Sequence, residues 1–254
     1  ALGVYEGKKY LWMSDIYRLY VFNLTDGVGF QNFTYTDIGA IRLDFERGRL
    51  GAYMTTTPTG GNSNLAYLDL NGTHMDQGDD VFTHYALSDL NSQSFLGSLI
   101  DSAENRVYAG SYFDGFYVWG DNNTPSDPSD DIVDVTTDGD YQNVFTGMIL
   151  DPDGRLIFGT ANNSNGRLFV ITDDGDDPYS WDDDTIVQLA YPAQIGYRNI
   201  YGIQYIEGQN GVGDQLLLNT EGSIPVYLNF NDTYTNLTDD TFIEFDLTGG
   251  VRPS

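Results

Sequence analysis

The most frequent residue pattern with a defined chemistry is the Asn-x-Ser/Thr triplet, the acceptor sequence for an N-linked sugar. Seven triplets occur in the 254 residues, none has proline at its middle position, and six end in Thr. They begin at Asn23, Asn32, Asn71, Asn122, Asn162, Asn231 and Asn236. This repetition predicts a chain that carries N-linked glycans. The alternative is that Asn and Thr are frequent simply because both residues favour turns.

Aspartates form a second pattern, which suits the binding of calcium. Four pairs of adjacent aspartates each precede an apolar segment: Asp79-Asp80, Asp130-Asp131, Asp183-Asp184 and Asp239-Asp240. One of them ends the segment TDDGDDPYSWDDD (172–184). Because Ca²⁺ takes six to eight oxygen ligands, these aspartates suit a calcium site, with Asp173, Asp174, Asp176, Asp177, Asp183 and Asp184 as the candidate ligands. The spacing does not fit an EF-hand loop, and the alternative is a solvated acidic loop that caps turns.

The sequence contains no recognisable set of catalytic residues. The two histidines, His74 and His84, fall in a loop and an outer strand, which are poor positions for a Ser–His–Asp arrangement. No glycine-rich phosphate loop occurs. Asp44, Asp101 and Asp151 each begin or precede a tight turn, where a bond from the side chain to the backbone is the simpler role. Glycoside hydrolysis by two facing carboxylates is the enzymatic alternative.

The composition restricts the classes of partner that the protein can bind and the covalent links that it can form. The formal net charge is −27, and Asp supplies 32 of the 38 acidic residues. A negative field of this size argues against nucleic acid and anionic membranes as partners. The chain contains no cysteine, so it forms no disulfide. No apolar run is long enough to span a bilayer, and the first residue, Ala1, fits a processed N-terminus.

An internal repeat indicates how the chain positions these residues. Five segments share an apolar strand, a turn rich in Gly, Asp, Glu or Asn, and a second strand: residues 2–15, 41–56, 97–112, 147–162 and 202–221. A third and a fourth strand follow each segment. Such units predict an all-β fold, a single β-propeller of five four-stranded antiparallel blades. The expected blades are residues 1–38, 39–96, 97–146, 147–201 and 202–254, and a β-sandwich is the alternative.

The blade pattern assigns the candidate residues to two faces of the disc. The triplets at Asn23, Asn71, Asn122 and Asn231 all follow a third strand, so we expect them on one face, together with the aspartate pairs. Loops on the opposite face converge on the central channel, where propellers bind ligands. The candidates there for a sugar or a small polar ligand are Tyr112, Asp114, Tyr197, Arg198, Asn199 and Glu221.

Two of the repeated units resemble blades of known families. DPDGRLIFGTANNSNGRLFVI and DSAENRVYAGSYFDGFYVW resemble the generic blade of the senescence-marker/gluconolactonase and NHL propellers. SQSFLGSLIDSAENRVYAGSYFDGFYVWGDN also resembles a blade of the yellow/major royal jelly family. These families typically have six blades, and no lactonase metal ligand matches. The resemblance therefore implies the fold and leaves the activity open.

These patterns together predict a secreted or cell-surface glycoprotein that acts as a structural, adhesive or assembly module. We expect self-association or an extracellular protein partner, and the acidic loops could make this assembly depend on Ca²⁺. A lactonase-like hydrolase, a glycoside hydrolase, or a monomeric binder of sugars or small ligands at the channel mouth is the alternative.

Overall fold

The structure is a computed structural model of the whole chain. The described residues are 1–14, 18–27, 30–34, 38–56, 64–71, 78–85, 95–111, 116–136, 144–161, 166–172, 177–182, 184–190, 193–196, 198–208, 213–221, 225–230, 240–246 and 250–253.

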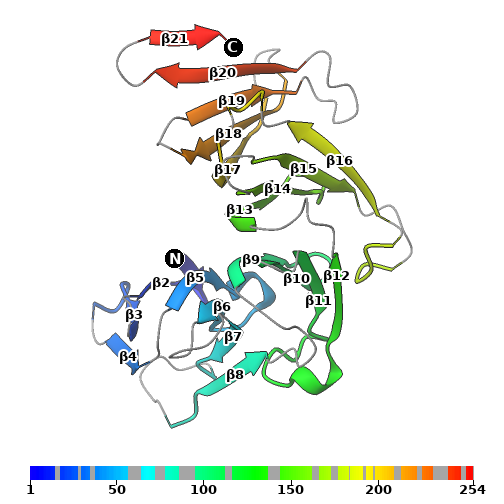
Figure 1. The fold of residues 1–254 in the computed structure, drawn as a ribbon. Helices are drawn as coiled ribbons and strands as arrows, with labels where there is room; N and C mark the ends of the chain where they lie inside the picture. The colour runs from blue at the N-terminus through cyan, green and yellow to red at the C-terminus, as the bar shows by residue number, and fades with distance from the viewer. Residues whose placement is uncertain are drawn as a thin grey trace.

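Five antiparallel sheets follow one another along the chain, and each one is a propeller blade (Figure 1). Blade 1 contains β1 (Leu2–Tyr5), β2 (Lys8–Ser14), β3 (Arg18–Asn23) and β4 (Phe30–Thr34). Blade 2 contains β5 (Ile38–Leu43), β6 (Gly51–Thr56), β7 (Asn64–Asp69) and β8 (Val81–Tyr85). Blade 3 contains β9 (Phe95–Asp101), β10 (Arg106–Ser111), β11 (Phe116–Gly120) and β12 (Ile132–Thr136).

The two C-terminal blades complete the set. Blade 4 contains β13 (Val144–Leu150), β14 (Leu156–Thr160), β15 (Leu168–Thr172) and β16 (Thr185–Ala190). Blade 5 contains β17 (Ile200–Ile206), β18 (Gln215–Thr220), β19 (Pro225–Asn229), β20 (Thr241–Asp246) and β21 (Gly250–Pro253). The predicted five-bladed all-β fold is therefore confirmed, with one addition. Blade 5 has a fifth strand, β21, which pairs antiparallel with β20.

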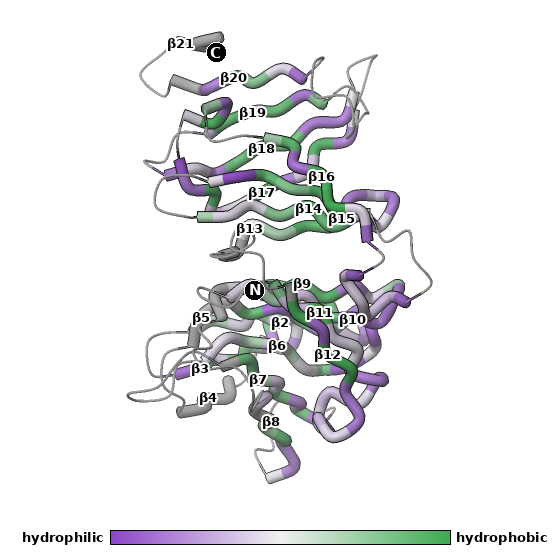
Figure 2. Tube along the Cα trace, turned by 45° about the vertical axis from the view of Figure 1, so that its right-hand side comes forward, coloured by the Kyte–Doolittle hydropathy of each residue, from purple (hydrophilic) through white to green (hydrophobic). Residues whose placement is uncertain are grey.

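Apolar residues at alternate positions explain why the sheets stack. In blade 1, Trp12, Leu19 and Val21 point to the same face and are fully buried, because side chains in a strand alternate between its two faces. The central strands of blades 3 and 4 are buried on both faces, and β10, β11 and β14 consist of buried residues throughout. Figure 2 shows the same contrast, with hydrophobic strands and hydrophilic connections.

A separate core cluster fills each of the four junctions between consecutive blades. Trp12 meets Met54 between blades 1 and 2, and Tyr53 shares a cluster with Trp119 between blades 2 and 3. The clusters between blades 3 and 4 and between blades 4 and 5 are formed in the same way. The rings of Phe116 and Phe158 stack across the junction of blades 3 and 4, with their centroids 4.8 Å apart. Each blade is thus held by its neighbours in the sequence.

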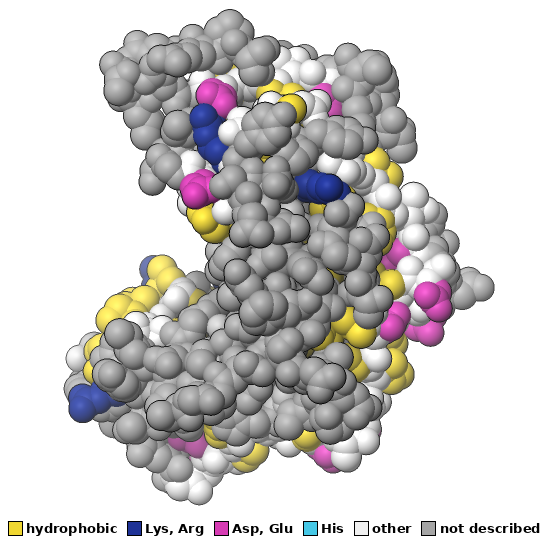
Figure 3. Space-filling view, in the orientation of Figure 1, with side chains coloured by type: hydrophobic (Ala, Val, Ile, Leu, Met, Phe, Trp, Pro, Cys, Tyr) yellow, Lys and Arg dark blue, Asp and Glu magenta, His cyan; other side chains and the backbone are white. Residues whose placement is uncertain are grey.

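The five blades form an open arc. Among the described residues no core cluster joins blade 1 to blade 5. Figure 3 shows a deep notch on one side of the molecule, between the N-terminal blades and the C-terminal blade. Two short 3₁₀ turns, η1 (Phe45–Arg47) and η2 (Pro128–Asp130), are the helical elements of the described residues, and neither could cross a membrane.

Candidate functional site

Each of three consecutive blades holds an aspartate–arginine pair at the turn that follows its first strand. In blade 3, Asp101 Oδ1 accepts the amides of Ala103 and Glu104 at 3.1 and 3.2 Å, and its Oδ2 accepts Arg106 Nε at 3.0 Å. In blade 4, Asp151 Oδ1 accepts the amide of Arg155 at 2.8 Å, and its Oδ2 accepts Arg155 Nε at 2.7 Å. The turn-capping role predicted for Asp101 and Asp151 is therefore confirmed.

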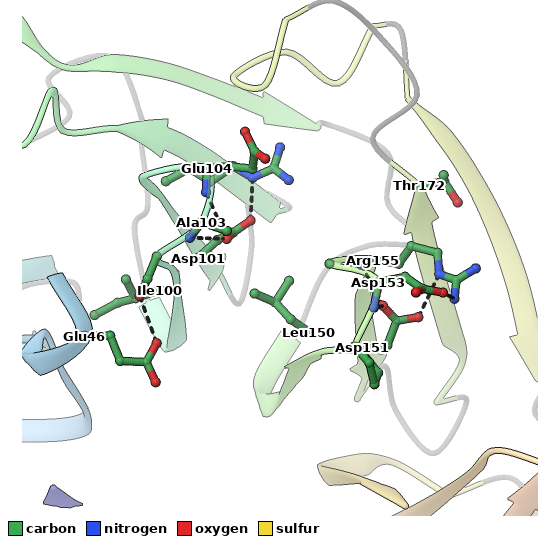
Figure 4. Close-up of a pocket in the computed structure, with 14 residues that line it drawn as sticks. Glu46, Ile100, Asp101, Ala103, Glu104, Leu150, Asp151, Asp153, Arg155 and Thr172 are labelled. Atoms are coloured by element: carbon green, nitrogen blue, oxygen red, sulfur yellow. Dashed lines mark hydrogen bonds and ion pairs between the residues drawn. The ribbon is translucent and has the colours of Figure 1, made fainter. Parts of the chain in front are cut away.

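These turns surround a cavity of about 660 Å³ at the inner edge of the arc, called here the mouth pocket. In Figure 4 the Asp101 turn and the Asp151–Arg155 pair lie on opposite sides of Leu150. The carboxylates of Glu46, Glu104 and Asp153 complete the charged lining. Five acidic and two basic side chains line the cavity, so its formal charge is −3. A cavity of this size and sign suits a cationic group whose apolar stem covers Leu150.

Four of the five carboxylates of the mouth pocket, those of Glu46, Asp101, Asp151 and Asp153, accept hydrogen bonds or form ion pairs. Glu46 Oε2 accepts the hydroxyl of Ser102 at 3.0 Å. Arg155 contacts both Asp151 and Asp153.

Blade 2 departs from this pattern, because its aspartate belongs to a buried ionic network with blade 3. Arg47, whose side chain is 4% exposed, contacts two fully buried carboxylates: its Nη2 lies 3.0 Å from Asp44 Oδ2 and 2.8 Å from Asp121 Oδ2. Arg49 Nη1 adds a second contact to Asp44, at 3.1 Å. The role predicted for Asp44, a bond to the turn backbone, is thus replaced by bonds to two guanidinium groups.

Tyrosine hydroxyls complete the network. Tyr67 donates to Asp44 at 3.0 Å, Tyr53 donates to Asp121 at 2.5 Å, and Tyr85 donates to the carbonyl oxygen of Pro125 at 2.5 Å. Burial raises the pKa of all three hydroxyls well above the usual value, so they remain neutral donors. Burial alone would lower the pKa of Arg47, but its bonds to Asp44 and Asp121 raise that pKa above the usual value.

Asp131, the second member of an aspartate pair, lies beside this network. Both its carboxylate oxygens are buried and have no hydrogen-bond partner in the described part of the chain. Burial, followed by the charges of Asp121, Asp130 and Asp127, raises the pKa of Asp131 to about 7. A large fraction of this carboxyl group is therefore protonated near neutral pH.

The triplet asparagines that follow third strands differ in their access to solvent. Asn23, at the end of β3, is 2% exposed; its Oδ1 accepts the amides of Thr25 and Asp26, and its Nδ2 donates to Asp26. Asn71 and Asn122 are exposed and have positive φ angles of 46° and 45°. Asn122 Nδ2 donates to the carbonyl of Asp130 at 2.7 Å. Asn32 lies within β4, opposite Tyr20. Asn162, Asn231 and Asn236 lie outside the described residues.

Most of the proposed calcium ligands also lie outside the described residues, namely Asp173, Asp174, Asp176 and Asp183. Asp177 Oδ1 accepts the amide of Tyr179 at 3.0 Å, and the amide of Asp184 donates to Trp181. Within the described ranges no group of three or more His, Asp or Glu side chains is arranged to hold a metal ion. The calcium site stays a prediction.

The ligand residues predicted on the opposite face are brought together only in part. Tyr112, Asp114 and Tyr197 lie outside the described residues. The amide of Glu221 donates to the carbonyl of Asn199 at 2.9 Å, so β17 and β18 place these two residues side by side. Arg198 Nη1 lies 2.7 Å from Glu244 Oε1, so Arg198 forms an ion pair within the protein. His84 lies in β8, the outer strand of blade 2, as expected, and His74 lies outside the described residues.

The mouth pocket and the buried network were not predicted from the sequence. A signal for the turns was present, because an arginine follows each aspartate after four or five positions: Asp44 and Arg49, Asp101 and Arg106, Asp151 and Arg155. No such spacing indicates that Arg47 bonds to Asp121, because these residues are 74 positions apart.

The two terminal blades each leave one sheet face in solvent. In blade 1 this open face consists of Leu2, Val4, Lys9, Leu11, Met13, Arg18, Tyr20 and Phe22, which share one side of the strands. In blade 5 the residues on this side are Gly202, Gln204, Ile206, Gln215, Leu217, Asn219, Pro225, Tyr227, Asn229, Thr241 and Ile243. The opposite face of each of these sheets packs against the neighbouring blade.

Comparisons with known proteins support the fold and leave the function open. No family model matches the chain, and no curated protein sequence matches it. Among solved structures, the chain is similar to the β-propeller domain of Cps50 (Swd1) from Myceliophteria thermophila, with a TM-score of 0.55 and 9% sequence identity. The similarity covers 95% of this chain and 78% of that domain. It supports blades of the general propeller type and does not single out the families named above.

Proposed function

We propose that this chain is an extracellular, N-glycosylated assembly module without catalytic activity. The observation that carries the proposal is that both terminal blades leave one sheet face without a neighbouring sheet, and that the face of blade 1 exposes large apolar side chains. Leu2 and Val4 are 66% and 58% exposed on such a face. Contiguous exposed apolar surface on a soluble protein typically marks an interaction site.

The glycan and calcium parts of the proposal rest on the sequence. Seven acceptor triplets support a glycoprotein. A net charge of −27 opposes association between copies. Calcium bound by the aspartate pairs would reduce this repulsion, so we include dependence on divalent cations in the proposal.

The test is the solution mass of the natively glycosylated protein, measured by light scattering over a range of protein concentrations. We expect assemblies in Ca²⁺ that shrink when a chelator is added. Sodium chloride at matched ionic strength is the control, because it screens charge without binding. A monomer under all these conditions would contradict self-assembly, and turnover of a lactone or a glycoside would contradict the non-enzymatic role.

A second candidate function is the binding of a positively charged ligand, and the mouth pocket favours it. Its charge of −3 and its apolar residues Ile100 and Leu150 fit a lysine or arginine side chain. The test is titration with an oligolysine peptide, comparing Glu46→Gln and Glu104→Gln with Glu207→Gln, an exposed site outside the pocket. Equal affinity of all three variants would exclude the pocket.

A further inference from the structure

The fold repeats one kind of interface four times. At each junction an apolar sheet face of one blade packs on an apolar face of the next blade. Four junctions between five blades leave one face of each kind unused, and these are the open faces of blade 1 and blade 5. In a closed ring of blades these two faces would meet at a fifth junction.

The open face of blade 1 presents protruding apolar side chains. Leu2, Val4 and Met13 are 66%, 58% and 45% exposed, whereas Trp12 on the covered face of the same sheet is fully buried. The rings of Tyr20 and Phe22 stack on this side, with their centroids 6.5 Å apart. The face resembles the covered faces in composition and differs from them in lacking a neighbouring sheet.

The open face of blade 5 is hollowed. A cavity of about 320 Å³ lies over β17 and β18, and its lining includes Gly202, Leu217 and Pro225. Gly202 has no side chain to fill this space, and an added Cβ would meet only Asn219, at an ordinary contact distance of 3.5 Å. The hollow is wide enough for a branched apolar side chain such as those that protrude from blade 1.

Charge distinguishes the two open faces. Lys9 and Arg18 lie on the open face of blade 1, whereas none of the described side chains on the open face of blade 5 is Lys or Arg. Residues 1–38 contain three basic and four acidic residues, and residues 200–254 contain one basic and eight acidic residues. Contact between blade 1 and blade 5 is therefore electrostatically better than contact between two copies of blade 5.

We propose that blade 1 of one copy docks by its open face on the open face of blade 5 of a second copy. The inference rests on the proposed assembly function and names its interface. Closing the ring within one chain would require at least one packed junction to move, whereas docking of a second copy leaves all four intact. A contact between two different faces is heterologous, so each added copy again exposes one face of each kind and the assembly can grow.

The test uses two variants that each block one face. Leu2→Gln with Val4→Gln makes the open face of blade 1 polar, and Gly202→Leu fills the hollow of blade 5. We expect each variant to associate with itself at least about tenfold more weakly than the unmodified chain, measured by light scattering and sedimentation. Val81→Gln with Ile132→Gln, at sites 41% and 48% exposed on other blades, is the matched control and retains full association.

Mixing the two blocked variants gives the decisive result. One variant retains only the open face of blade 5 and the other only that of blade 1, so the mixture forms a one-to-one dimer that cannot grow. Growth of either blocked variant alone would overturn this interface while leaving the assembly function standing. A monomeric unmodified chain, with and without Ca²⁺, would overturn both. Circular dichroism and melting temperature verify that every variant is folded.

Discussion

At the scale of single residues, the charged groups of this protein differ most in how far water can reach them. Lys8 and Asp26 form an exposed ion pair at 2.9 Å, which contributes little because water screens it. Arg47 is enclosed between the carboxylates of Asp44 and Asp121. Removing one member of such a buried set leaves a charge that neither water nor a partner stabilises.

Arg47→Met is therefore expected to lower the free energy of unfolding by about 3–5 kcal/mol, because Asp121 loses its guanidinium partner and Asp44 loses one of its two. Urea unfolding monitored by tryptophan fluorescence measures the effect. Lys8→Met is the control and is expected to leave the stability nearly unchanged, because water screens the exposed pair. Equal losses in the two variants would show that the network contributes no more than a surface pair.

Asp131→Asn is expected to stabilise the protein at alkaline pH. The folded-state pKa of Asp131 is raised to about 7 from an ordinary value of 3.8. The folded state consequently binds more protons than the unfolded state between these values, and this group removes stability as the pH rises from about 4 to about 7. Asparagine carries no charge, so the difference between variant and parent grows across that window. Allowing for partial screening by solvent, we expect a gain of about 1 kcal/mol at pH 8.

Unfolding at pH 4 and at pH 8 measures this difference. Asp182→Asn, at an exposed position, controls for the general loss of negative charge. A stability difference between Asp131→Asn and the parent that is the same at both pH values would contradict the assignment.

At the scale of the elements, the ends of the third strands are alike in sequence and unlike in structure. β3 ends at the buried Asn23, whose side chain bonds to the following turn. The strand β7 is followed by Asn71, whose side chain is exposed. A sugar on Asn23 would require that side chain to leave its buried position and give up its bonds to Thr25 and Asp26.

In a host that adds N-linked glycans, occupancy is accordingly expected to be higher at Asn71 than at Asn23. Mass spectrometry of glycopeptides gives both occupancies from one sample. Asn71→Gln should leave stability unchanged, whereas Asn23→Gln should lower it, since the longer side chain cannot repeat the turn contacts. Full occupancy of Asn23 in a stably folded protein would refute this argument.

The elements were largely predictable because their signals are local. An apolar strand, a turn with Asp or Gly, and a second apolar strand recur within about twenty residues, so the five sheets follow from the sequence. The contacts of Arg47 with Asp121 join distant positions and depend on how blades 2 and 3 are placed. The mouth pocket likewise combines the turns of three blades, so no single segment reveals it.

At the scale of the whole molecule, the open arc gives the blades unequal support. Blades 2, 3 and 4 are packed on both faces, whereas blades 1 and 5 are packed on one. Local stability depends on the apolar contacts that an element must lose to open. The arc therefore resembles a stacked repeat protein, in which the terminal units are the least protected.

Native-state hydrogen exchange is expected to show this gradient. Amides of β2 and β18 should exchange at least about tenfold faster than those of β10 and β14, under conditions where the chain is monomeric. Protection of β2 and β18 should rise in the assembled state, with β10 as the internal reference. Uniform protection along the monomer would contradict the unequal support.

The open arc also affects how the protein folds during its synthesis. In a closed propeller the last blade must reach the first before the ring is complete, which couples the two ends of the polypeptide. Here every blade junction in the described residues joins blades that are consecutive in the sequence. Each new blade can therefore pack against the previous blade as soon as it leaves the ribosome. Synthesis and folding can thus proceed in the same direction, and a polypeptide interrupted after any blade keeps the junctions already formed.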